Sequence, residues 1–241
     1  MMPAAAILVG GQATRLHPVT RTIPKAMLQV AGKPFIAHQL DLLKKKGVTE
    51  VIICSGYLSD QIEDFIGDGK HFGLSIGFSV DGEKLLGTGG AIKKALPLLN
   101  DVFFVMYGDT YLTIDFRSVS DFFLSQNKEG LMTVLHNKDR WGRSNTVLKN
   151  GQITKYDKKE KTTDMEYIDY GLTVLRKSAF DEIGDEQVFD LAKIYQSLIR
   201  EEQMIGYEVK NRFYEIGSAE GLAETEEYLL SLSKRNQGAY S

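Results

Sequence analysis

A short apolar run that ends in two glycines constrains this chain more than any other stretch. The run covers residues 4–9, and Gly10 and Gly11 follow it directly. Because glycine adopts positive φ without a steric penalty, such a turn lets backbone N–H groups approach a ligand, and those groups form a concavity that favours anions. The pattern predicts a buried parallel strand with a phosphate-binding loop at its carboxyl end.

Spacing excludes two common phosphate loops. No G-x-x-x-x-G-K-[ST] pattern occurs in the chain, and no G-x-G-x-x-G pattern follows a strand. The run from Gly10 to Pro34 instead resembles the signature of the sugar-1-phosphate nucleotidyltransferases, which reads G-G-x-[GA]-T-R-L-x-P-x-T-x-x-x-P-K-[AP]-[ML] and is followed shortly by G-K-P. On this long motif with fixed spacing, the chain is identified as a member of that family.

The resemblance implies that the loop holds a nucleoside triphosphate, that Arg15 lies over its phosphates and that Lys25 neutralises the reacting phosphates. Arg suits this role because it offers a planar fork of donors to phosphate oxygens, and Lys because it is a compact charge. The alternative is a glycine turn with two solvated cations, which leaves Pro18, Thr20 and Pro24 unexplained. The nucleotide-binding residues expected in the loop are Val9, Gly10, Gly11, Gln12, Ala13, Thr14 and Arg15.

A carboxylate is expected at the same edge of the sheet. Residues 102–107 are strongly β-prone, and Gly108 and Asp109 follow them. Asp109 resembles the family's metal-binding aspartate, which implies a Mg²⁺ cofactor. The ion suits this position, because Mg²⁺ takes one or two carboxylates and completes its shell with phosphate oxygens and water. The alternative is an aspartate that only caps the following turn.

Residues 85–91 resemble the family loop that contacts the nucleobase and ribose. Within it, Gly87, Thr88 and Gly89 are expected to bind the nucleotide, since glycines give the base close access to backbone groups. A helix N-cap formed by the Thr88 hydroxyl is the alternative, and the two roles are compatible.

The second half carries residues where the family has its sugar-phosphate contacts. The family pattern there is a glycine, a Glu-Lys pair, and an Asn or similar polar residue before a glycine. This chain departs from it twice, because Asp157 replaces the usual Glu and Asp169 stands where Asn is common. A lysine-rich hairpin on an ordinary surface is the alternative. The sugar-phosphate-binding residues expected from the resemblance are Lys25, Gly142, Asp157, Lys158 and Asp169.

A second metal ligand is expected late in the chain. Residues 213–218 resemble the family's late strand that ends in Asp-x-G, whose aspartate shares the metal with the earlier one. Glu215 stands at that place, and its extra methylene lets it reach Mg²⁺ with a shifted backbone or through a water. The alternative is a glutamate that only stabilises the start of the helix after Ser218 through the helix dipole.

The alternation of strand and helix patterns predicts the fold class. The first half has a βαβ rhythm, which implies an α/β fold with a mainly parallel sheet. The resemblance adds that the fold is Rossmann-like, with flanking helices of the nucleotide-diphospho-sugar transferase type and a smaller β-rich sugar-binding lobe. Helices are expected at about 34–46, 59–66, 87–97, 116–126, 188–200 and 219–232, and strands at 4–9, 51–54, 74–80, 102–107, 131–136, 145–149, 152–156 and 167–175.

The dipeptide Asn150-Gly151 predicts a hairpin between the strands that flank it. We expect one domain over residues 1–241, with a nucleotide-binding half at about 1–128, a sugar-phosphate-binding half at about 129–233 and a frayed tail at 234–241. No hexapeptide repeat occurs, so we expect the catalytic module alone.

Composition limits the partners and the location. The formal net charge is −3 with a pI near 5.9, and no stripe of Lys and Arg alternates with aromatics, so nucleic-acid binding is not expected. The single Cys54 forms no intrachain disulfide, which fits a reducing compartment. The first apolar run is too short for a signal peptide and no apolar stretch is long enough to cross a bilayer, so we expect a cytoplasmic protein without a membrane partner.

These features lead to one expected reaction. A sugar-1-phosphate oxygen attacks the α-phosphate of a nucleoside triphosphate in line, which releases pyrophosphate and forms an NDP-sugar. Arg15, Lys25 and Asp109 are the expected catalytic residues. The motifs look closest to guanylyltransferases that act on mannose or heptose 1-phosphate and would feed cell-surface polysaccharide synthesis. A glucose-1-phosphate thymidylyl- or cytidylyltransferase and a non-catalytic nucleotide-sugar-binding regulatory subunit are the alternatives. The expected partners are the two substrates, the NTP and the sugar 1-phosphate, and a second copy of the chain in a homo-oligomer is an open alternative.

Overall fold

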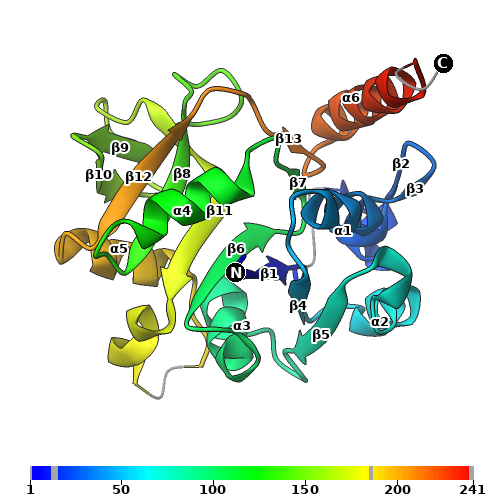
Figure 1. The fold of residues 1–241 in the computed structure, drawn as a ribbon, viewed down its shortest axis with the longest axis horizontal. Coiled ribbons are helices and arrows are strands. Elements are labelled where there is room, and N and C mark those ends of the chain that lie inside the picture. Colours follow the sequence, from blue (N-terminus) through cyan, green and yellow to red (C-terminus); the bar gives the residue numbers. More distant parts are fainter. Residues whose placement is uncertain (1, 12–15, 185–186, 239–241) are drawn as a thin grey trace.

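The computed structural model describes residues 2–11, 16–184 and 187–238, with side chains as far as residue 235. Within these ranges, nine strands form one sheet in the order β5-β4-β1-β6-β11-β8-β12-β10-β9 (Figure 1). Helices cover both faces of the sheet, and no helix of the described residues is both long and apolar enough to cross a membrane. The expected α/β fold with flanking helices is confirmed.

Four neighbouring strands from the first half of the chain are parallel. Their carboxyl ends therefore meet at one edge of the sheet, and the first of them is buried along nearly its whole length, as the apolar run predicted. The four strands are β1 (Ala4–Leu8), β4 (Glu50–Ser55), β5 (Ser75–Val80) and β6 (Val102–Tyr107).

The second half continues the same sheet in mixed orientation instead of forming a sheet of its own. Strand β11 (Tyr167–Arg176) runs antiparallel between β6 and β8 (Gly130–His136), and so joins the two halves. The expected hairpin between β9 (Thr146–Lys149) and β10 (Gln152–Tyr156) is confirmed, with φ of 51° at Asn150 and 77° at Gly151. These two positive φ angles are those of a type I′ turn.

One strand of the nine-stranded sheet was not expected from the sequence. Strand β12 (Met204–Val209) lies between β8 and β10. Its Gly206 lowers the strand propensity of the segment, yet a side chain there would meet the Leu148 Cδ1 atom at 2.3 Å. Close packing of neighbouring side chains over this glycine, which local sequence does not reveal, places the strand.

The helices divide into two sets by the face of the sheet that they cover. Ile36, Leu40 and Leu43, which recur at helical spacing in the first helix, are fully buried in one of the two cores. One face carries α1 (Phe35–Lys45), α2 (Ser59–Ile66) and α4 (Phe116–Leu124), and the other carries α3 (Gly87–Ala95) and α5 (Ala192–Arg200). Short 3-10 segments are η2 (Val19–Arg21), η3 (Lys25–Met27), η4 (Lys70–Phe72), η5 (Leu96–Leu98) and η6 (Lys177–Ile183).

Two small ribbons and a long helix complete the described residues. The last helix, α6 (Ala219–Gly238), lies at one end of the molecule and continues past Lys234, so the frayed tail expected from that residue onward is not seen as far as residue 238 (Figure 1). The ribbons pair β2 (Gln29–Val30) with β3 (Lys33–Pro34) and β7 (Thr110–Tyr111) with β13 (Tyr214–Glu215).

Candidate active site

A cleft of about 280 Å³ opens at the carboxyl edge of the parallel strands. The loops that follow β1, β5 and β6 contribute its walls, which is the expected place for a ligand in a sheet of this kind. The cleft combines apolar walls with a few charged groups. The lining residues are Leu8, Val9, Gly10, Gly11, Lys25, Ala26, Cys54, Asp81, Leu85, Gly87, Thr88, Ala91, Tyr107, Gly108 and Asp109.

Lys25 and Asp109 form an ion pair inside this cleft. The Lys25 Nζ atom lies 2.7 Å from Asp109 Oδ2, and their side chains are 15% and 33% exposed. Lys25 begins η3 directly after Pro24, whereas Asp109 follows the end of β6. The two predicted catalytic residues that the structure describes are therefore in direct contact.

The backbone around Asp109 is held from two sides. The Gly108 N–H donates to the Leu8 carbonyl at 2.9 Å, and the Ile216 N–H donates to the Asp109 carbonyl at 2.9 Å. Gly108 has no room for a side chain, because a Cβ there would lie 2.3 Å from the Val9 Cγ1 atom. The carboxylate is thus placed beside the glycine loop by a close backbone approach between β1 and β6.

The first three residues of the predicted phosphate loop, Val9, Gly10 and Gly11, line the cleft next to Lys25 and Asp109. The rest of the loop, Gln12, Ala13, Thr14 and Arg15, lies outside the described residues. The described part of the loop therefore stands where the sequence predicted it.

The glycines of the predicted base-binding loop serve tight packing between the two halves of the chain. A Cβ on Gly87 would lie 2.6 Å from the Phe189 carbonyl oxygen, and one on Gly89 would lie 2.3 Å from the Phe189 ring. Thr88 does not cap its own helix, since α3 begins at Gly87 and the Thr88 hydroxyl accepts the Leu191 N–H, at the start of α5, at 2.8 Å. Gly87 and Thr88 line the cleft, whereas Gly89 does not.

Asp81 is a candidate functional residue that the sequence interpretation missed. It follows β5 and lines the cleft, and its Oδ2 atom accepts the Leu86 N–H at 3.0 Å. Its Oδ1 atom is buried and has no hydrogen-bond partner within the described ranges. Burial raises the pKa of Asp81 above its usual value. An acidic residue directly after a parallel strand was the available signal, because the same reasoning identified Asp109.

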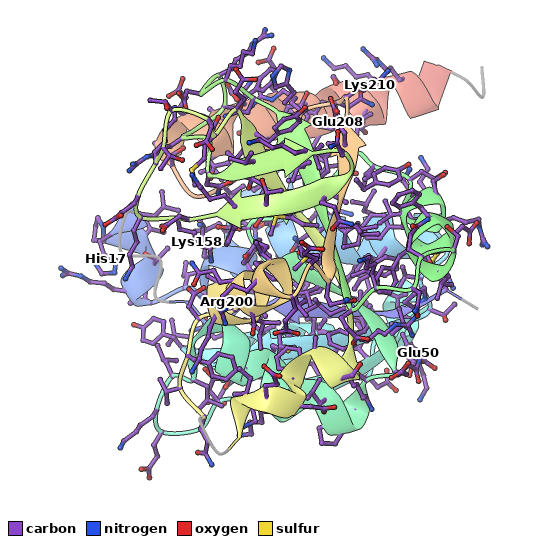
Figure 2. All side chains as sticks on the ribbon, turned by 90° about the vertical axis from the view of Figure 1, so that its left-hand side faces the viewer. His17, Glu50, Lys158, Arg200, Glu208 and Lys210 are labelled. Atoms are coloured by element: carbon purple, nitrogen blue, oxygen red, sulfur yellow. The ribbon has the colours of Figure 1, made fainter. Side chains whose placement is uncertain are left out.

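Lys158 approaches the cleft from the second half of the chain. It follows β10, where Figure 2 labels it, and its Nζ atom lies 5.6 Å from the centre of the Tyr107 ring, which lines the cleft. The same Nζ atom pairs with Asp190 Oδ1 at 3.2 Å. Lys158 itself is not among the cleft-lining residues, but its ammonium group lies over the ring of Tyr107, which is one of them.

The other predicted sugar contacts lie outside the cleft walls. The Asp169 carboxylate accepts the Gly171 N–H at 2.9 Å and the Tyr156 hydroxyl at 3.3 Å, and burial raises its pKa. The Asp157 carboxylate accepts the N–H groups of Lys159 and Glu160, so it closes its own turn. Gly142 has a φ of 108°, and its carbonyl accepts the Asn137 side chain at 2.7 Å.

Glu215 is a near neighbour of Asp109 along the backbone, because it pairs with Thr110 in the β7–β13 ribbon. Its carboxylate turns toward the start of α6, where it accepts the Gly217 N–H and, at 2.8 Å, the Ser218 hydroxyl. The structure therefore displays the helix-start contacts of the alternative interpretation. These bonds leave further lone pairs on both oxygens, since a carboxylate has about four acceptor sites.

The donor set at Asp109 suits a hard cation that shares its shell with a substrate. Within the described part of the chain, no cluster of three or more His, Cys, Asp or Glu side chains is placed to hold a metal. An ion that needs a full protein cage does not fit this edge. An ion that binds one or two carboxylates and takes phosphate oxygens and water for the rest does fit.

Comparison with known proteins agrees with this geometry. A family model described as nucleotidyl transferase matches residues 4–231. The mannose-1-phosphate guanylyltransferase catalytic subunit beta of Xenopus tropicalis is 30% identical over 219 residues, which are 88% of this chain and 61% of that protein. The N-acetylmuramate alpha-1-phosphate uridylyltransferase of Neisseria meningitidis serogroup B is 44% identical over 115 residues, which are 47% of this chain and 50% of that protein.

The fold also matches a solved structure. The crystal structure of HddC from Yersinia pseudotuberculosis complexed with GMP-PN superposes with a TM-score of 0.80 at 24% identity, over 95% of this chain and 100% of that chain. At this identity the likeness concerns the fold. The chain spans about three fifths of the length of its Xenopus relative.

Proposed function

This chain belongs to the nucleotidyl transferase family. We propose that it transfers a nucleoside monophosphate from an NTP to a sugar 1-phosphate, with GMP as the first candidate for the transferred group. The observation that carries the proposal is the Lys25–Asp109 pair beside the Gly10–Gly11 turn. It supplies both a cation and a hard oxygen donor at the carboxyl edge of the sheet, where a triphosphate would meet backbone N–H groups.

In the proposed reaction, an oxygen of the sugar 1-phosphate attacks the α-phosphorus, the bond to the β-phosphate oxygen breaks, and pyrophosphate leaves. The attacking oxygen is already anionic, so no general base is needed. Lys25 and Arg15 would neutralise the phosphates, and transfer of this kind depends mainly on positioning and charge. Asp109, with Glu215, would hold Mg²⁺, which when bound neutralises charge on the phosphates.

Asp81 supports guanine as the base. The strand order β5-β4-β1-β6 puts Asp81 and Asp109 on opposite sides of the glycine turn, so a nucleotide with its phosphates at Asp109 would extend its base toward Asp81. A carboxylate only accepts hydrogen bonds, and guanine presents adjacent N1–H and N2–H donors. Uracil presents one N–H between two carbonyl oxygens, which the carboxylate would repel.

Mannose or heptose 1-phosphate is the sugar substrate that we propose first. The supporting observation is similarity over most of the chain to a protein named mannose-1-phosphate guanylyltransferase. Lys158 would reach the sugar phosphate, and Gly142, Asp157 and Asp169 would surround the sugar. Uridylyl transfer to N-acetylmuramate 1-phosphate is the second candidate, since half of the chain is 44% identical to a protein named for it.

Ligand-induced stabilisation gives the first test. A ligand at 100 times its Kd stabilises a protein by about 2.7 kcal/mol, so GTP should raise Tm more than UTP, dTTP or CTP at equal concentration. A pyrophosphate-release assay then pairs each nucleotide with mannose, heptose, glucose and N-acetylmuramate 1-phosphates. We expect release with GTP and one of the first two sugars.

Other outcomes of this panel have distinct meanings. Selective stabilisation by UTP, with turnover of UTP, would favour uridylyl transfer to N-acetylmuramate 1-phosphate. Selective stabilisation by dTTP or CTP, with turnover of that nucleotide, would favour a glucose-1-phosphate thymidylyl- or cytidylyltransferase. Nucleotide stabilisation without any pyrophosphate release would indicate a nucleotide-sugar-binding regulatory subunit.

Replacing Glu215 with glutamine tests the second metal ligand. If Glu215 shares the ion with Asp109, the variant should need several times more Mg²⁺ for half-maximal rate and should show a lower kcat, whereas Glu215→Asp should keep much of the activity. The Ser218 contact predicts a stability loss of about 1 kcal/mol in the glutamine variant regardless of metal binding. Glu224→Gln on α6, which breaks an ion pair with Arg212 in the loop before β13, is the control. An unchanged Mg²⁺ titration and rate would remove Glu215 from the site.

We also propose the two-part division expected from the sequence, with nucleotide binding in residues 1–128 and sugar-phosphate binding in residues 129–233. The cytoplasm is the proposed location, and the buried free thiol of Cys54, whose pKa burial raises to about 12, suits a reducing compartment. A homo-oligomer remains compatible with this function.

A further inference from the structure

Gln39 is a fully buried polar side chain on the apolar face of α1. Its exposed fraction is 0%, and Ile36 and Leu43 lie three residues before it and four after it on the same helix face. A buried amide must find hydrogen-bond partners or lower the stability of the fold. The partners of Gln39 therefore indicate what the residue does.

The amide group of Gln39 spans the turn that carries Asp109. Its Nε2 atom donates to the Tyr107 carbonyl at 2.9 Å and to the Thr110 carbonyl at 2.8 Å. Tyr107 ends β6 and Thr110 begins β7, so Gly108 and Asp109 lie between the two bonded carbonyls. One side chain thus fixes the backbone on both sides of the proposed metal carboxylate.

The other polar atom of this side chain shows that the core alone does not favour glutamine. The Gln39 Oε1 atom is buried and has no hydrogen-bond partner in the part of the chain that the structure describes. An unsatisfied buried acceptor costs stability. An apolar residue at this position would fill the core without this cost. Glutamine carries the cost because its amide group donates two hydrogen bonds to the turn.

The helix that carries Gln39 also contacts the segment of Lys25. The Phe35 N–H at the start of α1 donates to the Leu28 carbonyl at 2.9 Å, one residue after η3, and Ala26 shares a core with Ile36. Gln39 therefore ties the Asp109 turn to the same helix that supports the lysine facing it.

We propose that Gln39 is a positioning residue, which holds the turn 107–110 so that the Asp109 carboxylate faces the cleft and binds a divalent cation. This inference rests on the proposed function for the identity of the cation. It requires only that Asp109 takes part in binding it. Partners that orient a metal ligand without touching the metal matter at other sites, where their loss costs about 10- to 100-fold in metal affinity.

The test compares Gln39→Met with Leu43→Ala in the full chain. Methionine keeps the unbranched shape and removes both donors, while Leu43→Ala leaves a cavity in the same helix without touching the turn. Mn²⁺ serves as the probe, and its binding is measured by electron paramagnetic resonance with and without a non-hydrolysable GTP analogue. We expect Mn²⁺ affinity to fall about tenfold in Gln39→Met and to stay at the parent value in Leu43→Ala.

Turnover supplies a second measurement. In Gln39→Met, the Mg²⁺ concentration for half-maximal rate should rise and kcat should fall, while the KM for the sugar phosphate stays within about twofold. Equal Mn²⁺ affinity in Gln39→Met and the parent, or an equal loss in both variants, would overturn the inference. If the parent turns over no substrate pair, the proposed function fails and Mn²⁺ binding still decides the role of Gln39.

Discussion

Lys25→Ala is expected to lower kcat/KM by about two to three orders of magnitude while the protein stays folded. The Lys25 ammonium group lies within hydrogen-bond distance of Asp109 in the cleft. The reacting phosphates would meet beside this ammonium group. Removing one preorganised donor from such a site costs roughly 3–4 kcal/mol of transition-state stabilisation. Steady-state kinetics with the productive substrate pair, beside circular dichroism of the variant, measures the effect.

Lys70→Ala is the matched control. Lys70 pairs with Asp68 at 2.6 Å, but the two side chains are 87% and 60% exposed and lie outside the cleft, so activity should stay near the parent value. Mn²⁺ binding without nucleotide should strengthen in Lys25→Ala, because the ammonium group no longer competes for the Asp109 carboxylate. A folded Lys25→Ala protein with parental turnover would contradict the catalytic assignment.

The shared location of Lys25 and Asp109 at one site was predicted although 84 positions separate them, but their direct ion pair was not. Each residue carries a signal of its own, Lys25 in a long motif with fixed spacing and Asp109 at the end of a β-prone run. Parallel strands bring their carboxyl ends to one edge, so the topology implied by the βαβ rhythm was enough to place Asp109 beside the Gly10–Gly11 turn. Lys25 follows β1 at a distance and was placed at the phosphates by the motif alone.

Contacts between the two halves of the chain were not predictable in this way. The spacing of Gly87 and Gly89 suggested access for a base, yet the structure shows the Phe189 backbone and ring where their side chains would be. Nothing in the local sequence says that residues 187–191 return to this loop. The bends of Asp157 and Glu215 onto their own turns depend in the same way on local geometry that residue type alone leaves open.

Gln39 and Asp81 were missed for a different reason. Both carried a usable signal, Gln39 because it interrupts an apolar helix face and Asp81 because it follows a strand at the ligand edge. A polar residue in such a pattern is commonly solvated, and only the structure shows that one is fully buried and that the other has a buried, unpartnered oxygen. The buried, unpartnered oxygen of Asp81 leads to a prediction on base selectivity.

Asp81→Asn is expected to lower the preference for GTP over UTP by roughly 10- to 100-fold, the effect of losing hydrogen bonds to a charged group. Asparagine has one acceptor and one donor group at this place, so it pairs with guanine less well and no longer repels the uracil carbonyls. The ratio of kcat/KM for the two nucleotides measures the change. Asp64→Asn, an exposed position on α2, should leave the ratio unchanged.

The pH dependence of the parent protein should show the same carboxylate. Burial raises the pKa of Asp81, so the group takes up a proton at a higher pH than an exposed aspartate would. The protonated form loses its charge and places a hydrogen toward the guanine donors. The kcat/KM for GTP should therefore fall as pH decreases through the raised pKa, and this fall should be absent in Asp81→Asn.

The stability of the folded protein should respond to pH in the direction opposite to that of kcat/KM for GTP. Because folding raises the pKa of Asp81, the folded state binds the proton more tightly than the unfolded state, and the free energy of unfolding decreases as pH rises through the raised pKa. At neutral pH the folded protein carries the cost of a partly desolvated charge, and Asp81→Asn removes it, so Tm should rise while selectivity falls. A residue that serves the core would lose stability on substitution, whereas one kept for its ligand would gain it. A variant with a lower Tm and parental selectivity would show that Asp81 only holds the Leu86 loop through the bond to its N–H group.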